Sequence, residues 1–314
     1  MSATVIDGKA AAAQHREETR QRAESLKERG ITPCLAVILA GEDPASLSYV
    51  TAKQKALAEA GMDSRDIRLA ATTSEAELLS LIASLNADTA VHGILVQLPL
   101  PKHIREPLVI AAIDPAKDVD CFHPVNAGKL LLEEPGFLPC TPHGIVHLLR
   151  QQNIPTKGAH AVIVGRSNIV GKPLAILLAR RELNATVTLC HTGTNDLKSH
   201  TLQADILVVA AGKAGLITGD MVKKGAALID VGVNRIADAT AKNGFRLKGD
   251  INFEEAAEVA GCITPVPGGV GPMTIAMLMR NVVQAAAGEL SAIGPDPLGT
   301  NRVVDTWKSR ILPE

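Results

Sequence analysis

Tyr49 and Lys53 are four residues apart in the segment Ser48-Tyr-Val-Thr-Ala-Lys-Gln-Lys55. In a helix this spacing places both side chains on one face, where a phenol and an amine could exchange protons with a substrate. Tyr49 is the single tyrosine of the chain. The structural alternative is a helix with one buried ring and a lysine whose aliphatic stem packs along it. The pair indicates acid–base chemistry only if other polar groups gather near it.

Three further segments carry groups that could complete such a site. Gln97 stands at the end of an apolar run, where a polar side chain needs a hydrogen-bond partner. Residues 117–124, Lys-Asp-Val-Asp-Cys-Phe-His-Pro, place Asp118 and Asp120 in a rigid loop. Residues 264–274, Thr-Pro-Val-Pro-Gly-Gly-Val-Gly-Pro-Met-Thr, are too conformationally specialised for a simple linker.

Residues 160–171, His-Ala-Val-Ile-Val-Gly-Arg-Ser-Asn-Ile-Val-Gly, have the pattern of a strand, a glycine turn and the start of a helix. Glycine lets the backbone approach a pyrophosphate, and the first turn of the helix offers N–H groups and a positive dipole end. The fingerprint is irregular, because Ser167 replaces its second glycine and Gly165 and Gly171 are six residues apart. The strands that follow favour a nucleotide site over a merely structural turn.

The choice of nicotinamide cofactor can be argued from charge. An NAD site expects an acid after the second strand to accept from the ribose 2′-hydroxyl, but residues 186–190 run into His191 and Thr192. Arg166 and the Thr192 hydroxyl could instead bind a 2′-phosphate through charge-assisted hydrogen bonds. These residues favour NADP, with a solvated loop arginine as the structural alternative.

A Tyr-x-x-x-Lys pair is also the proton-transfer pair of short-chain dehydrogenases. In that family the pair follows the glycine turn, whereas here Lys53 precedes Gly165 by more than a hundred residues. The short-chain interpretation is therefore disfavoured.

Helical and strand patterns alternate along the chain, which predicts an α/β fold with parallel sheets. The expected helices are residues 8–29, 45–60, 75–85, 171–181 and 273–287, and the expected strands are 34–40, 92–98, 160–164, 186–190, 206–210 and 226–231. The proline-rich stretch 114–142 is predicted to be mostly loop and to mark a boundary.

We therefore expect two domains with a cleft between them. Residues 1–141 plus 273–314 would form an N-terminal α/β lobe that the last apolar helix rejoins, and residues 142–272 would form a Rossmann-type dinucleotide-binding domain.

Composition excludes several classes of protein. The chain has 314 residues, 32 Lys and Arg against 33 Asp and Glu, and only four Phe, one Tyr and one Trp. It lacks the basic excess and the aromatic platforms of a nucleic-acid binder. No apolar run is long enough for a membrane span or a signal peptide, so we expect a soluble cytoplasmic protein.

Cysteine usage gives no disulfide framework, because the five cysteines are widely spread and form no C-x-x-C pair. Cys140, His143 and His147 could lie near one another at the start of a helix, and thiolate and imidazole are zinc ligands. No fourth ligand accompanies them, so we expect no metal site.

Together these segments resemble the bifunctional methylenetetrahydrofolate dehydrogenase/methenyltetrahydrofolate cyclohydrolase family. The resemblance extends from the Asp43-Pro-Ala-Ser46 turn to the helix after Gly271, and Pro-Val-Pro-Gly-Gly-Val-Gly-Pro-Met is its most specific part. It implies NADP-dependent oxidation of 5,10-methylenetetrahydrofolate to the methenyl form, and hydrolysis of that form to 10-formyltetrahydrofolate.

The resemblance also assigns roles. Lys53 would be the main catalytic residue, Tyr49 and Gln97 would assist it, and Asp120 would bind the pterin. The folate cleft would be lined by Pro265, Gly268, Gly269 and Pro272, and NADP would be bound by Gly165, Arg166, Ser167, Thr192 and Val233. A homodimer formed through the nucleotide domains is implied as well.

Two alternatives stay open: a dehydrogenase without cyclohydrolase activity, and a catalytically silent folate-binding subunit. The chain also departs from the family pattern. Cys121 stands where the family has glycine in Asp-Val-Asp-Gly, and a positive φ there would strain a cysteine. Thr51-Ala52 replaces the more usual Arg-Asn before Lys53, and the tail after Ala287 has no functional account.

Overall fold

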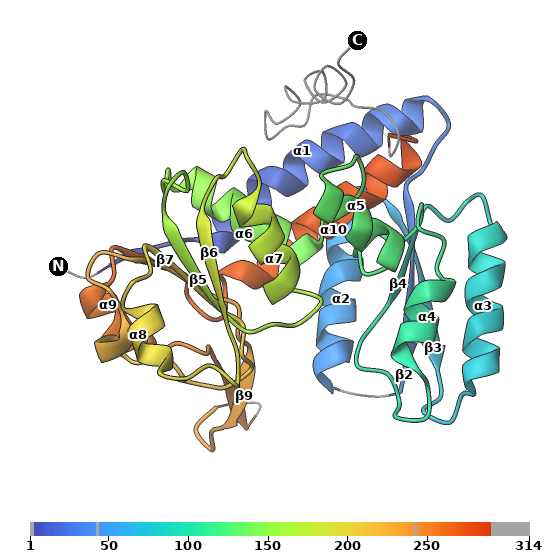
Figure 1. Ribbon diagram of the computed structural model, residues 1–314. Helices are drawn as coiled ribbons and strands as arrows, with labels where there is room; N and C mark the ends of the chain where they lie inside the picture. The colour runs from blue at the N-terminus through green and yellow to red at the C-terminus, as the bar shows by residue number, and fades with distance from the viewer. Residues whose placement is uncertain (1–2, 42–43, 242–243, 290–314) are drawn as a thin grey trace, which may run out of the picture.

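The computed structural model describes residues 3–41, 44–241 and 244–289. A three-stranded sheet and a six-stranded sheet, both parallel, stand side by side with helices packed on them (Figure 1). A two-stranded antiparallel hairpin projects from the six-stranded half (Figure 1). The arrangement confirms the predicted α/β class.

The three-stranded sheet has the order β3-β2-β4. Its central strand β2, Cys34–Ala40, is buried along its whole length, as expected for an apolar strand covered on both faces. β4, Gly93–Val96, is also buried, whereas the edge strand β3, Asp63–Leu69, is mostly exposed. The sequence pattern missed β3 because Asp-Ser-Arg-Asp-Ile-Arg-Leu has no apolar alternation. The helices of this half are α2 (Pro44–Glu59), α3 (Glu75–Ala87) and α4 (Glu106–Ala112).

The six-stranded sheet has the order β1-β11-β8-β7-β5-β6. Its strands are β1 (Thr4–Val5), β5 (His160–Val164), β6 (Thr186–Cys190), β7 (Ile206–Val209), β8 (Ala227–Asp230) and β11 (Cys262–Ile263). Its helices are α7 (Gly171–Ala179), α8 (Leu197–Thr201), the 3₁₀ turn η1 (Gly219–Met221) and α9 (Phe253–Val259). The N-terminal strand β1 was not predicted, and it extends this sheet by pairing with β11.

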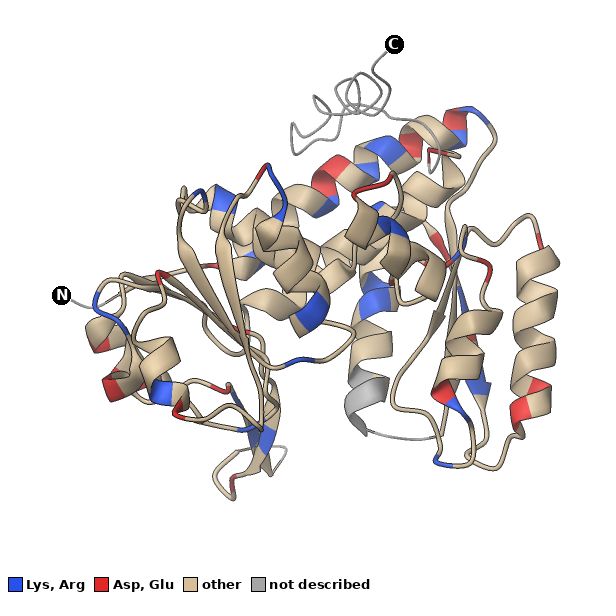
Figure 2. Ribbon diagram, in the orientation of Figure 1, with Lys and Arg blue, Asp and Glu red and all other residues tan. Residues whose placement is uncertain are grey.

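Three long helices join the halves: α1 (Gly8–Glu28), α6 (Cys140–Gln151) and α10 (Val270–Ala286). Asp7 directly precedes α1, and its carboxylate accepts from the backbone N–H groups of Lys9 and Ala10 and so caps the helix. α10 packs against α1 and α6 and also reaches β2 and β4 of the smaller sheet. Acidic and basic residues alternate along α1, whose apolar stripe faces α10 (Figure 2).

One apolar core runs through the molecule from one sheet to the other. It includes Val37 of β2, Met277 of α10, Ile145 of α6 and Ile163 of β5. Burial of these side chains is the main force that holds the two sheets in a fixed relation. Separate cores lie behind β7 and β8 and between β2 and α3.

The stretch 114–142 differs from the prediction, because it contains a helix and the start of another. α5, Pro124–Leu132, begins with proline at its first position, where no N–H is needed, and the His123 ring accepts from the Val125 N–H. α6 likewise begins directly after Pro139. Two of the prolines that suggested a loop, Pro124 and Pro139, mark helix starts instead.

The hairpin of β9 (Asn234–Ala237) and β10 (Phe245–Lys248) was not predicted either. The predicted final helix is present and begins three residues early, at Val270. Among the described residues, no helix is long and apolar enough to cross a membrane.

Candidate active site

Lys53 lies on the buried side of α2, with 8% of its surface exposed, and Tyr49 lies one turn earlier with 39% exposed. The Lys53 amine donates to Gln97 Oε1 across 3.1 Å. Gln97 follows the last residue of β4, and its own Nε2 donates to the Leu98 carbonyl at 2.8 Å. That second bond orients the amide, so that its oxygen faces the lysine.

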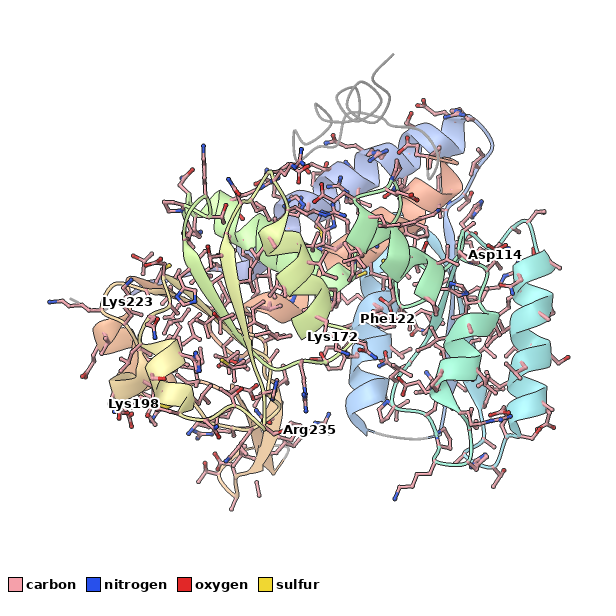
Figure 3. All side chains as sticks on the ribbon, in the orientation of Figure 1. Asp114, Phe122, Lys172, Lys198, Lys223 and Arg235 are labelled. Atoms are coloured by element: carbon pink, nitrogen blue, oxygen red, sulfur yellow. The ribbon has the colours of Figure 1, made fainter. Side chains whose placement is uncertain are left out.

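Tyr49 is influenced by the other half of the molecule. Burial raises the pKa of its phenol, and the positive charge of Arg235 acts in the opposite direction. Arg235 belongs to β9 and lies over the ring of Phe245, 4.6 Å from its centroid. Figure 3 shows Arg235 at the lower end of the six-stranded half. The hairpin therefore brings a cation of one half close to the candidate catalytic helix of the other.

The loop that carries Asp120 lies alongside β4, because Asp118 forms a β-bridge with Ile94 of that strand. The buried Asp118 carboxylate accepts from the backbone N–H groups of Phe122 and His123 and from Asn126 Nδ2, at 2.8–3.1 Å. The Asp118 carboxylate therefore stabilises the loop through these bonds, and Asp120 is the acid of the pair that could bind a ligand.

Burial raises the pKa of Asp120, the charge of Lys53 opposes that rise, and Asp118 adds to it. These effects place Asp120 and Lys53 in one electrostatic site. Asp120 also lines a small recess, together with Asp118 and Phe122; the other lining side chains are apolar and include Ile94, Val96, Leu98, Ile110 and Ile113. The structure therefore brings Lys53, Gln97 and Asp120 together at the carboxyl end of β4.

Cys121 adopts the conformation that would favour glycine, with φ of +62°. Its buried thiol donates to the Phe137 carbonyl at 3.2 Å. Burial, reinforced by the neighbouring acids Asp118 and Asp120, raises the pKa of this thiol well above its usual value. The strain expected for a cysteine at this position is therefore present in the loop that holds Asp120.

The segment 264–274 connects β11 to α10 and is tightly packed. Gly268 has φ of +110°, and a Cβ on Gly269 would lie 2.7 Å from the Pro265 carbonyl oxygen. The Thr264 hydroxyl accepts from the Asp230 N–H at 2.7 Å. Pro265, Gly268 and Gly269 thus form a loop of fixed shape, and Pro272 lies in the first turn of α10. None of the hydrogen bonds of the described residues joins this loop to Lys53, so its part in a folate cleft stays a prediction.

The glycine turn has the close packing that a dinucleotide cradle requires. Gly165 has φ of +128°, and a Cβ there would lie 2.1 Å from the Ala210 oxygen. A Cβ on Gly171 would lie 1.9 Å from the Gly165 oxygen. Ser167 Oγ accepts from the Val170 N–H at 3.1 Å at the start of α7, while the Ser167 hydroxyl hydrogen stays available to a ligand.

Other predicted cofactor residues lie at the same edge of the sheet. Arg166 is exposed in the glycine turn, Thr192 is exposed after β6, and Val233 is 43% exposed after β8. The next acid after β6 is Asp196, whose carboxylate accepts from the Ser199 N–H at the start of α8. The carboxyl edge thus offers a backbone cradle, an arginine and hydroxyl groups, a set that fits a phosphorylated dinucleotide.

Two buried acids at this edge were missed by the sequence analysis. Asp230 accepts from the N–H groups of Gly232, Asp250 and Ile251, and burial raises its pKa to about 6. Asp250 accepts from the N–H groups of Ala211 and Gly212 and from Asn234 Nδ2. The two acids tie together the loops after β7, β8 and β10. An acid at the end of an apolar strand, as in Leu228-Ile-Asp230, is the signal that could have found them.

The three residues considered as zinc ligands, Cys140, His143 and His147, make other contacts. Cys140 is buried and donates to the Val119 carbonyl, whereas the Nε2 atoms of His143 and His147 lie 3.1 Å apart. Within the ranges that the structure describes, no group of three or more His, Cys, Asp or Glu side chains is arranged to hold a metal ion.

The fold and this site define a class: a two-part α/β dehydrogenase with a nicotinamide dinucleotide edge on one sheet and an amine–amide–carboxylate site on the other. Two family models match the chain. Residues 6–120 match the catalytic domain of tetrahydrofolate dehydrogenase/cyclohydrolase, and residues 139–290 match the NAD(P)-binding domain of the same family. The chain therefore belongs to the tetrahydrofolate dehydrogenase/cyclohydrolase family.

Individual relatives agree with this assignment. The bifunctional protein FolD of Exiguobacterium sibiricum is 58% identical over 90% of this chain and 99% of its own, and that of Bacillus subtilis is 56% identical over 93% and 100%. The FolD structure from Campylobacter jejuni has a TM-score of 0.87 at 49% identity, covering 92% of this chain and 100% of its own. The FolD structure from Trypanosoma brucei, complexed with NADP cofactor and an inhibitor, has a TM-score of 0.89 at 39% identity, covering 93% and 100%.

Proposed function

We propose that the chain oxidises 5,10-methylenetetrahydrofolate with NADP and then hydrolyses the methenyl product to 10-formyltetrahydrofolate. The observation that carries the proposal is the hydrogen bond from Lys53 to Gln97 beside Asp120, in a chain whose two parts match both domains of the bifunctional family. Oxidation and hydration then take place at one site, on one bound folate.

Lys53 serves the hydration step. Water adds to the methenyl carbon and loses one proton, which leaves a hydroxyl on that carbon. The hydroxyl then loses its proton to become the formyl carbonyl, as the bond from the carbon to a ring nitrogen breaks and that nitrogen receives a proton. An amine near a cationic substrate is favoured in its uncharged form, which can accept the proton from water. Gln97 orients this amine without adding a charge, and Tyr49 contributes a second polar group on the same face of α2.

Asp120 binds the pterin. A carboxylate can accept two parallel hydrogen bonds from an amino group and an adjacent ring N–H. Its partly enclosed position beside the apolar recess excludes competing water from those bonds. Pro265, Gly268, Gly269 and Pro272 border the folate with a rigid backbone surface.

The cofactor is bound at the carboxyl edge of the six-stranded sheet. Gly165 and Ser167 face the pyrophosphate with the start of α7, Arg166 and Thr192 hold the 2′-phosphate, and Val233 provides an apolar contact. Bound NADP supplies a hydride acceptor. The protein's part in that step is orientation, because the folate nitrogens themselves stabilise the cation that remains.

We also propose that residues 1–141 with 273–314 form the folate-binding catalytic domain and residues 142–272 the NADP-binding domain. Packing of α10 against β2 and β4 supports the return of the chain to the first domain, although β1 pairs with the sheet of the second. Residues 290–314, the tail in this division, lie outside the described part of the chain. A homodimer formed through the nucleotide domains, a cytoplasmic location and the absence of nucleic-acid binding belong to the same proposal.

One assay separates this function from its alternatives. The protein is mixed with methylenetetrahydrofolate and NADP, and the ultraviolet absorbance of NADPH and of the methenyl intermediate is followed together. NADPH formation with transient methenyl absorbance supports the bifunctional enzyme. Methenyl absorbance that persists above the nonenzymatic background indicates a dehydrogenase alone, and no NADPH indicates a silent folate-binding subunit.

A further inference from the structure

Asn281 is a buried amide in the apolar helix α10, with 1% of its surface exposed. Its neighbours along the helix include Met277, Leu278 and Val282, which are all buried hydrophobic side chains. A polar group in such surroundings is costly unless its hydrogen-bonding atoms are paired. The contacts of Asn281 therefore indicate why this position is not apolar.

The Asn281 amide nitrogen donates to two backbone carbonyls that are distant in sequence. Its Nδ2 lies 2.8 Å from the Val119 oxygen and 2.9 Å from the Leu138 oxygen, so both of its hydrogens are used. Nδ2 also lies 3.6 Å from Cys140 Sγ, and this thiol donates to the same Val119 oxygen at 3.4 Å. One side chain thus binds two separate backbone segments to α10.

The Val119 carbonyl belongs to the peptide bond that leads directly into Asp120. After Asp120 in the chain, the backbone N–H groups of Phe122 and His123 donate to the Asp118 carboxylate. The Asp120 loop is consequently fixed at two points, once by its own acid and once by Asn281 from the C-terminal helix. The Cys140 thiol, which Asn281 also contacts, lies near Asp120: burial, and after it the charge of the Asp120 carboxylate, raises the pKa of this thiol.

We propose that Asn281 is a positioning residue for Asp120, and so sets the affinity of the folate site from α10. This inference rests on the proposed function of Asp120 in binding the pterin. The amide group is specifically suited to the task, because two N–H groups on one planar nitrogen meet two carbonyl oxygens. Leucine has a similar shape but would take the amide donor away from both carbonyls, leaving Val119 with only the weak thiol donor of Cys140, and aspartate would present oxygen to oxygen.

The test uses the full-length protein and the variants Asn281→Leu and Asn281→Ser, with Val282→Ala as a matched control. Val282 is the next residue of α10, is fully buried and contributes no polar atom. Asn281→Leu removes both hydrogen bonds, and we expect it to raise the KM for methenyltetrahydrofolate about tenfold. The dissociation constant for NADP should stay unchanged. Asn281→Ser retains one hydrogen-bond donor and should give a KM between those of the natural protein and the leucine variant. If the leucine variant does not fold, the serine variant is used for the test.

A double-mutant cycle with Asp120→Asn distinguishes positioning from general damage. If Asn281 acts through Asp120, Asn281→Leu should change the KM much less in the Asp120→Asn background than in the natural one. Independent, additive effects overturn the proposal, as does an equal rise in KM for Val282→Ala at matched stability to urea. An unchanged KM in Asp120→Asn alone removes the proposed pterin role and the inference with it. A changed KM in Asp120→Asn together with an unchanged KM in Asn281→Leu removes the inference only.

Discussion

The Lys53 amine and the Gln97 side-chain oxygen lie 3.1 Å apart, and the Gln97 amide is in turn held by the Leu98 carbonyl. Lys53 belongs to α2, and Gln97 is the residue after β4. A helix and a strand end of the smaller half therefore fix the position of one amine. Gln97 is an uncharged partner, so it holds the Lys53 amine in place by a hydrogen bond and adds no charge to the site.

Replacement of Lys53 by methionine should abolish hydrolysis of methenyltetrahydrofolate. Methionine keeps much of the buried stem but cannot transfer a proton, and general acid–base groups contribute about 100-fold or more. NADP affinity should remain natural, because the cofactor edge lies on the other sheet. Lys55→Met is the control, since Lys55 lies on the exposed side of the same helix and pairs with Glu59. Normal hydrolysis by Lys53→Met would refute the proposed role.

Replacement of Arg166 by alanine should reduce the preference for NADP over NAD. A charge-assisted hydrogen bond to a 2′-phosphate contributes about 1.5–3 kcal/mol, so the ratio of kcat/KM values should fall roughly 10- to 100-fold. The decrease should appear with NADP and not with NAD. Arg181→Ala, an exposed arginine just beyond the far end of α7, is the matched control. An unchanged NADP:NAD ratio in the Arg166 variant would contradict the assignment of the 2′-phosphate site.

Cys121 allows a test of backbone strain in the Asp120 loop. Both Cys121→Ala and Cys121→Gly remove the thiol that donates to the Phe137 carbonyl. At φ of +62° alanine retains the steric cost of the left-handed region, whereas glycine does not. The glycine variant should therefore be more stable than the alanine variant, by up to about 1 kcal/mol in urea unfolding. Greater stability of the alanine variant, which is the usual order elsewhere, would show that the loop is not strained.

The parts of the fold that the sequence predicted are those with a strong apolar period. β2 and α10 were predicted within a few residues because their burial leaves an uninterrupted or helical pattern of apolar side chains. β3 was missed because an edge strand can carry charged residues on both faces. α5 was missed because Pro124 at a helix start resembles a loop signal when its neighbours are unknown.

In the site, too, the sequence predicted groupings of residues that are near one another in the chain and missed contacts between residues that are far apart. Tyr49 and Lys53 could be paired from their spacing, and the glycine turn from its neighbours in sequence. The bonds of Asn281 span 162 and 143 residues, and those between Asp230 and Asp250 connect separate loops of the sheet edge. Such contacts depend on tertiary packing, which a local pattern does not contain.

A cluster of one buried and two partly buried histidines predicts how stability depends on pH. His15 of α1 and His147 of α6 have ring centroids 4.3 Å apart, and the His143 and His147 rings are 4.7 Å apart. Burial lowers the pKa of all three, to about 3 for His147, and the charges of Arg280 and Arg150 add to this for His147. Glu18 opposes the shift at His15.

In the folded protein His147 stays neutral down to about pH 3, and the lowered pKa values of His15 and His143 mean that they too take up protons less readily than in the unfolded chain, where histidines gain protons as the pH falls below about 6.5. The free energy of unfolding should therefore decrease from about pH 6.5 toward pH 3, by at most about 1.4 kcal/mol per pH unit for each histidine. Urea unfolding at several pH values measures this slope. His147→Gln should flatten it, and His103→Gln, at an exposed position, should not. An unchanged slope in His147→Gln would mean that the acid sensitivity arises from other groups, because glutamine cannot take up a proton in either state.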